Sequence, residues 1–136
     1  MIPNAIENNV WQQCCDAGPG NIFMFKQDRR NGTTTMMHTI ATKGLDKGLR
    51  VLTVHINERN KFKDTESTTF GSVEFFHILN DYDVLCIDDC NYMTEANVQR
   101  VIEYIQNKKW TNIFLFCSGE APLLESAAKH GGYVFN

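Results

Sequence analysis

The segment from Val84 to Asp89 constrains the fold more than any other part of the chain. Four apolar residues, Val84 to Ile87, follow one another without polar alternation, and two acids, Asp88 and Asp89, come directly after them. An unbroken apolar run of this length is typical of a strand that is buried on both faces, as in a parallel sheet. We therefore expect a central strand that carries two carboxylates to the edge of a sheet.

Similar runs alternate with segments of helical periodicity along the rest of the chain. The sequence predicts helices over 5–16, 34–45, 72–79, 94–108 and 122–129, with Thr94 as the N-cap of the fourth. It predicts strands over 21–25, 49–56, 83–87, 111–117 and 133–135. This alternation favours an α/β three-layer sandwich with a five-stranded parallel sheet. Ligands of such sheets bind beyond the carboxyl ends of the strands, which here hold the loop 26–33, the two acids and the segment 118–120.

Length and charge limit the classes of protein to which the chain can belong. Its 136 residues suit one domain, 1–136, in which 1–20 form an N-terminal helix and linker. With 43% hydrophobic and 21% charged residues the composition is that of a globular protein. The net charge of −3 gives no strong nonspecific attraction to nucleic acid. Residues 57–69 are polar without any period, so we expect a loop there.

The cysteines and histidines indicate neither a disulfide framework nor a zinc site. The five cysteines are an odd number without a Cys-x-x-Cys pair, and the four histidines are scattered. We therefore expect free thiols and a reducing compartment, the cytoplasm of a cell or of a host cell. The sequence has no basic and apolar leader and no stretch of membrane-spanning length, so no contact with a membrane is expected.

Three segments together resemble the core of P-loop ATPases of the AAA+ superfamily, in particular DnaA-type initiators and DnaC-type helicase loaders. Residues 32–40 resemble the end of the Walker A loop and its helix, 83–89 resemble Walker B, and 113–118 resemble the sensor-1 strand. The resemblance covers roughly 21–136 and implies a P-loop NTPase-like fold. Family members also carry a helical lid, a sensor arginine and an arginine finger. The chain shows none of these before Asn136, so the expectation is a core without a lid.

The resemblance also implies roles for individual residues. Asp88 and Asp89 would be the catalytic acids, and Asp88 and Thr34 would hold Mg²⁺. The residues that would bind ATP are Gly32, Thr33, Thr34, Arg29, Arg30 and Ser118.

The Walker A segment departs from the family pattern. Thr33 stands at the position of the phosphate-binding lysine, and Gln27 or Asp28 replaces the first glycine. Catalysis of phosphoryl transfer depends almost wholly on positioned cations, so efficient ATP hydrolysis is not expected.

The leading hypothesis is a catalytically degenerate pseudo-ATPase that acts as a binding or regulatory protein in DNA replication or a related AAA+ process. Its partner would be a protein, such as an AAA+ helicase loader, an initiator or a second copy of the chain, and a small degenerate core fits a phage or mobile-element protein. Two alternatives stay open. In a divergent Mg²⁺-dependent NTPase, Arg29 or Arg30 would replace the missing lysine and ATP with Mg²⁺ would be the cofactor. In a nucleic-acid-binding accessory protein, Lys26, Arg29 and Arg30 would contact phosphates.

Overall fold

The protein is an α/β sandwich, seen here in a computed structural model. The structure describes residues 11–13, 15–17, 20–26, 33–70, 82–106 and 112–135. In these ranges the strands are β1 (Ile22–Lys26), β2 (Val51–His55), β3 (Glu66–Thr69), β4 (Val84–Ile87), β5 (Asn112–Cys117) and β6 (Gly132–Phe135). The helices are α2 (Thr33–Asp46), α3 (Glu95–Gln106) and α4 (Pro122–Gly131), with the 3-10 turns η1 (Glu58–Asn60) and η4 (Cys90–Tyr92). Residues 11–13 and 15–17 are also helical.

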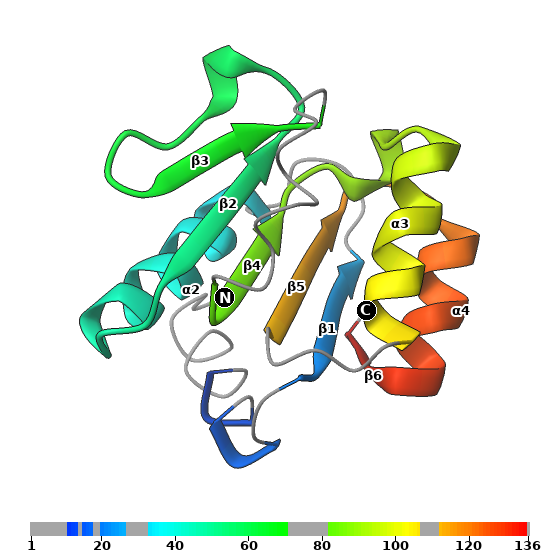
Figure 1. Cartoon of the computed structure of the whole chain (residues 1–136), viewed down its shortest axis with the longest axis horizontal. Helices are drawn as coiled ribbons and strands as arrows, with labels where there is room; N and C mark the ends of the chain where they lie inside the picture. Colours follow the sequence, from blue (N-terminus) through cyan, green and yellow to red (C-terminus); the bar gives the residue numbers. More distant parts are fainter. Residues whose placement is uncertain are drawn as a thin grey trace.

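All described strands belong to one parallel sheet, in the order β3-β2-β4-β5-β1-β6 (Figure 1). Parallel strands need crossover connections, and α-helices provide three of those described, whereas residues 56–65 with η1 connect β2 to its parallel neighbour β3. Helix α2 leads from β1 to β2, α3 from β4 to β5, and α4 from β5 to β6. The strands β4, β5 and β1 are adjacent, so their carboxyl ends meet at one rim of the sheet.

The two faces of the sheet are covered by different helices and differ in chemistry. Strand residues such as Ile22, Met24 and Leu115 pack with α3 and α4, which lie side by side in Figure 1. The alternate residues pack with α2, and four of their ring pairs are stacked with centroids 5.0–5.2 Å apart. These pairs are Phe23–Phe114, Phe23–Tyr133, Phe25–Phe116 and Phe25–Phe135. The strand period of two thus gives one aliphatic face and one aromatic face.

The fold class predicted from the sequence is confirmed, with one strand more than expected. The predicted loop over 57–69 is wrong for Glu66–Thr69, which form β3 beside β2. The hydroxyl groups of Thr53 and Ser67 lie 2.6 Å apart across this pair, so polar side chains hold the edge strand. Thr94 is the expected N-cap, because its Oγ1 accepts a hydrogen bond from the Asn97 N–H at 3.2 Å. The predicted helix over 72–79 lies outside the described residues.

The expectation of free thiols is wrong for one cysteine pair. Cys90, which opens η4, and Cys117, which ends β5, form a disulfide with their Cα atoms 5.3 Å apart. Parallel pairing of β4 with β5 brings these residues together although 27 positions separate them in the sequence. Cys15 is a free thiol, as expected.

Within the described part of the chain, no helix combines the length and the apolar character needed to cross a membrane.

Candidate functional site at the carboxyl ends of β1, β4 and β5

Polar side chains gather where the three neighbouring strands β1, β4 and β5 end. Lys26 is the last residue of β1, Asp88 and Asp89 follow β4, and Ser118 follows β5. Thr34 lies in the first turn of α2, directly beyond β1 along the chain. We call this group the rim site. The structure brings Thr34 to Asp88 and Ser118 to Asp89, and it directs Lys26 elsewhere.

Asp88 is the most buried polar residue of the rim site, with 4% of its surface exposed. Its backbone N–H donates to the Val54 carbonyl at 3.0 Å and so continues the sheet ladder. Its Oδ2 accepts a hydrogen bond from Thr34 Oγ1 at 2.8 Å, and its Oδ1 accepts one from the Asp89 N–H at 3.0 Å. Burial raises the pKa of the Asp88 carboxyl, and the Asp89 charge adds to the rise, while the Thr34 hydrogen bond opposes it.

Asp89 turns the chain away from the strand. Its backbone has φ 50° and ψ 40°, the left-handed conformation that aspartate tolerates better than most residues. Burial raises the pKa of the Asp89 carboxyl, and a hydrogen bond with the Ser118 side chain lowers it in part. Asn91 completes the link to β5, because its Oδ1 accepts a hydrogen bond from the Ser118 N–H at 3.1 Å. No sequence pattern indicated a role for Asn91.

Lys26 is bound by Glu125 of α4 and by Glu120, which lies two residues before α4. Its Nζ lies 2.9 Å from Glu125 Oε2 and 3.7 Å from Glu120 Oε2. The hydrogen bond with Glu125 raises the pKa of Lys26, and the same bond lowers the pKa of Glu125. Glu125 also pairs with Lys129 at 3.4 Å. The Lys26 charge is therefore already balanced by carboxylates.

Several residues that the resemblance assigns to ATP binding cannot be placed. Gly32, Arg29 and Arg30 lie outside the described residues, and Thr33 is described only as the first residue of α2. In the described ranges, no group of three or more His, Cys, Asp or Glu side chains is placed to hold a metal ion. Thr34 and Asp88 nevertheless fit Mg²⁺, because a hydroxyl and a carboxylate oxygen 2.8 Å apart are hard oxygen ligands. Mg²⁺ usually completes such a pair with waters and substrate phosphates.

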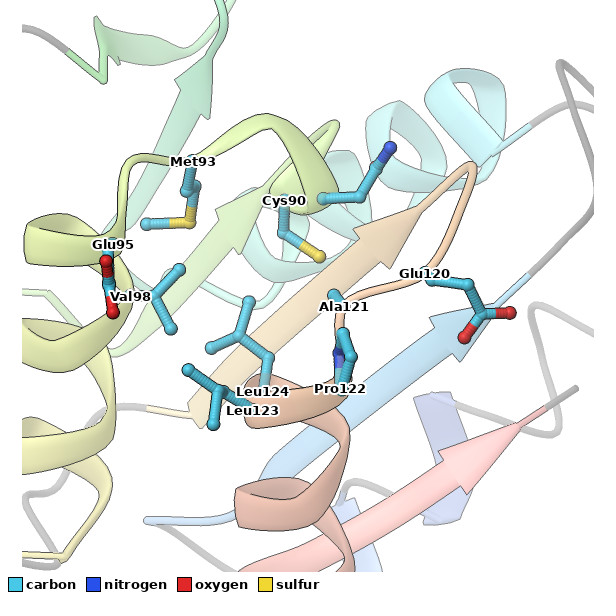
Figure 2. A pocket seen from close by; sticks show the side chains of 10 residues that line it. Cys90, Met93, Glu95, Val98, Glu120, Ala121, Pro122, Leu123 and Leu124 are labelled. Atoms are coloured by element: carbon cyan, nitrogen blue, oxygen red, sulfur yellow. The ribbon is translucent and has the colours of Figure 1, made fainter.

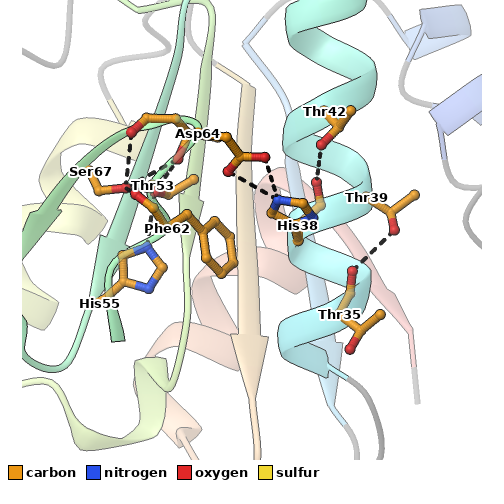
Figure 3. A network of polar contacts seen from close by, with 10 residues as sticks. Thr35, His38, Thr39, Thr42, Thr53, His55, Phe62, Asp64 and Ser67 are labelled. Carbon is orange, nitrogen blue, oxygen red and sulfur yellow. Dashed lines mark hydrogen bonds and ion pairs between the residues drawn. The ribbon is translucent and has the colours of Figure 1, made fainter. Parts of the chain in front are cut away.

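A second polar network, which the sequence did not indicate, connects α2 to the segment before β3 (Figure 3). His38 Nε2 lies 2.8 Å from Asp64 Oδ2, and the Phe62 ring stands edge-on between the rings of His38 and His55. His55 is fully buried, and its Nε2 lies 2.9 Å from Thr53 Oγ1. Burial lowers the pKa of His55 to about 4, so the ring is neutral at physiological pH. The network thus joins Phe62 and Asp64, which precede β3, to α2 and to β2.

Comparisons with known proteins identify the fold. No family model matches the chain, and no curated protein matches its sequence. Solved structures do match. A crystal structure of a DNA replication initiation factor aligns with a TM-score of 0.69 at 16% identity, over 97% of this chain and 45% of that chain.

Two further structures are of the replication initiator DnaA. One, bound to AMPPCP and single-stranded DNA, aligns with a TM-score of 0.66 at 14% identity, over 96% of this chain and 44% of that one. The other, AMPPCP-bound DnaA from Aquifex aeolicus, aligns with a TM-score of 0.61 at 18% identity, over 99% and 47%. The chain thus spans less than half the length of these proteins. At these identities the likeness is one of fold.

Proposed function

We propose that this chain is an AAA+-like module of DNA replication, or of a related process, which acts by binding a partner and does not hydrolyse ATP efficiently. The DnaA-like fold supports the replication context. Since a fold carries many activities, the site itself has to support the loss of catalysis.

The charge balance of the rim site is the observation that carries the proposal. Burial raises the pKa of both Asp88 and Asp89, and within the described ranges neither carboxylate forms an ion pair. The one basic side chain described in the rim site, Lys26, is paired with Glu125 and Glu120. Transfer of a phosphoryl group requires cations on the phosphates, and two carboxylates without such cations repel a triphosphate. The described part of the site therefore favours binding over turnover.

An active Mg²⁺-dependent NTPase is the alternative that the same residues allow. Asp88 and Thr34 would hold the ion, and the ion would neutralise charge on the bound phosphates. That alternative requires Arg29 or Arg30, outside the described residues, to supply the missing positive charge.

Calorimetric titration distinguishes the binding module from the NTPase. ATP and ADP are titrated with and without Mg²⁺ into protein that has been checked for co-purified nucleotide. The proposal expects no Mg²⁺-dependent ATP binding with a dissociation constant below about 1 mM, a value typical of weak binding. Submillimolar affinity that requires Mg²⁺ and that Asp88→Asn removes would overturn the proposal in favour of the NTPase. The matched control is Glu103→Gln, which removes an exposed carboxylate of α3.

Nucleic-acid binding is a second candidate function, because one of the similar structures is bound to single-stranded DNA. The residues that would carry it are Lys26, Arg29 and Arg30. Titration of a fluorescent oligothymidine would then show affinity that falls steeply with salt and weakens when these three residues are replaced by alanine. An affinity that does not depend on salt, or no affinity at all, would exclude this function.

A further inference from the structure

A hollow of about 230 Å³ opens between the N-terminal ends of α3 and α4, next to the rim site. Its walls are mainly apolar and come from η4, from the start of α3 and from the start of α4 (Figure 2). The apolar lining includes Cys90, Met93, Val98, Ala121, Pro122 and Leu124. We call this feature the α3–α4 hollow.

One wall of this hollow carries a large exposed apolar side chain, and a second exposed one belongs to η4. Leu123, which lines it, is 57% exposed, and Tyr92, which lies between two lining residues in the sequence, is 63% exposed. They are the two most exposed of the large hydrophobic residues in the described part of the chain. Single exposed apolar residues are ordinary, but an exposed leucine on the wall of an apolar depression is typical of an interaction site.

The size of the hollow indicates what it can receive. Sites for drug-sized molecules usually have volumes of about 300–1,000 Å³. The α3–α4 hollow is smaller than this range and is comparable with one large side chain. A protein partner commonly anchors itself through one such side chain, placed in a pocket of this kind at the centre of the interface.

The charges at the hollow indicate what should flank that side chain. The charged residues that line it, Glu95 and Glu120, are both acids, and they stand at opposite ends of the hollow in Figure 2. The Glu120 side chain is 82% exposed and lies 3.7 Å from Lys26, which pairs more closely with Glu125. A partner with basic residues on each side of the anchor would match both carboxylates.

We infer that the α3–α4 hollow docks a protein segment in which a large aromatic side chain stands between Lys or Arg residues. This inference specifies the partner chemistry of the proposed binding role and rests on that role. Its test is nonetheless independent of ATP: turnover would overturn the proposed function, whereas the peptide titration described next decides the docking site.

The probe is the peptide acetyl-Lys-Trp-Arg-amide, titrated into the isotope-labelled full chain and followed by proton–nitrogen NMR. Amide shifts should concentrate on η4 and on the first turns of α3 and α4. Replacing the probe's Trp by Ala, or its basic residues by Glu, should weaken binding by about tenfold or more, which corresponds to the loss of a good anchor or charge pair.

Two variants test the hollow itself. Leu123→Ser and Glu120→Gln change exposed side chains, so they should leave the fold intact. Each should lower the affinity for the probe by about fivefold to tenfold. The control is Leu45→Ser, on α2 at the opposite face of the sheet, where Leu45 is 39% exposed. It should leave the affinity for the probe unchanged.

Three results would overturn the inference. The first is the absence of shifts, or shifts centred on another surface. The second is equal affinity for the Trp and Ala peptides, or for the basic and acidic ones. The third is shifts in these segments that grow with protein concentration before any peptide is added, which would identify a second copy of the chain as the occupant.

Discussion

Removing the disulfide between Cys90 and Cys117 should destabilise the protein, and the sequence separation of the two cysteines gives the magnitude. The bond closes a loop with a sequence separation of 27. The loop-closure relation for an unfolded chain of that separation gives about 3.5 kcal/mol at 25 °C. Both cysteines are at least 99% buried, so their reduced thiols remain packed as small apolar groups. The loss should therefore come mainly from the greater entropy of the unfolded chain.

Equilibrium urea unfolding of oxidised and reduced protein measures this difference. A domain of this size has a free energy of unfolding of about 5–15 kcal/mol, so the midpoint should fall markedly on reduction. Cys90→Ala should resemble reduction, whereas Cys15→Ala, which changes an exposed free thiol, should have no effect. The reasoning is refuted if reduction lowers the free energy of unfolding by less than about 1 kcal/mol, or if both thiols of the oxidised protein react with an alkylating agent after denaturation.

Three further changes test the rim site, the sheet edge and a helix end. Burial raises the folded-state pKa of Asp88, so ionisation of this carboxyl destabilises the folded protein. The destabilisation is absent below the unfolded pKa of 3.8 and grows as the pH rises through the folded pKa. Urea unfolding of Asp88→Asn should accordingly show a gain in stability at neutral pH that vanishes in acid, and a constant difference would contradict this. A Cβ at position 132 would collide with the Ile22 carbonyl oxygen, so Gly132→Ala should lower the melting temperature more than Gly48→Ala, where φ is +79° but space is free. Thr94→Ala should cost about 1 kcal/mol in thermal unfolding and Thr94→Ser much less, because serine also caps helices; equal losses would exclude the capping role.

The buried elements could be predicted because their patterns are strong. The unbroken apolar runs of β1, β4 and β5 predicted central parallel strands, and these strands in turn predicted a common rim. Asp88 lies at that rim because it follows β4 directly. Thr34 and Asp88 are in contact although the two residues are far apart in the sequence.

The features that the sequence missed depend on long-range contacts between polar or small residues. Strand β3 consists of Glu, Ser and Thr, so it has no apolar alternation. Hydroxyl contacts, pairing with β2 and the ion pair of Glu66 with Arg50 hold it in place. The disulfide joins cysteines that follow no motif, and only the pairing of β4 with β5 brings them together. The ion pair of Lys26 with Glu125 spans 99 positions, so no local pattern could indicate it.

Steady-state ATP hydrolysis in the presence of Mg²⁺, compared between the natural chain and Asp88→Asn, tests the central claim most directly. The account predicts that both proteins hydrolyse ATP no faster than buffer alone, because the described rim site offers two acids and no unpaired cation to a triphosphate. A Mg²⁺-dependent rate in the natural chain that falls by about a hundredfold or more in Asp88→Asn would contradict it and identify a working NTPase.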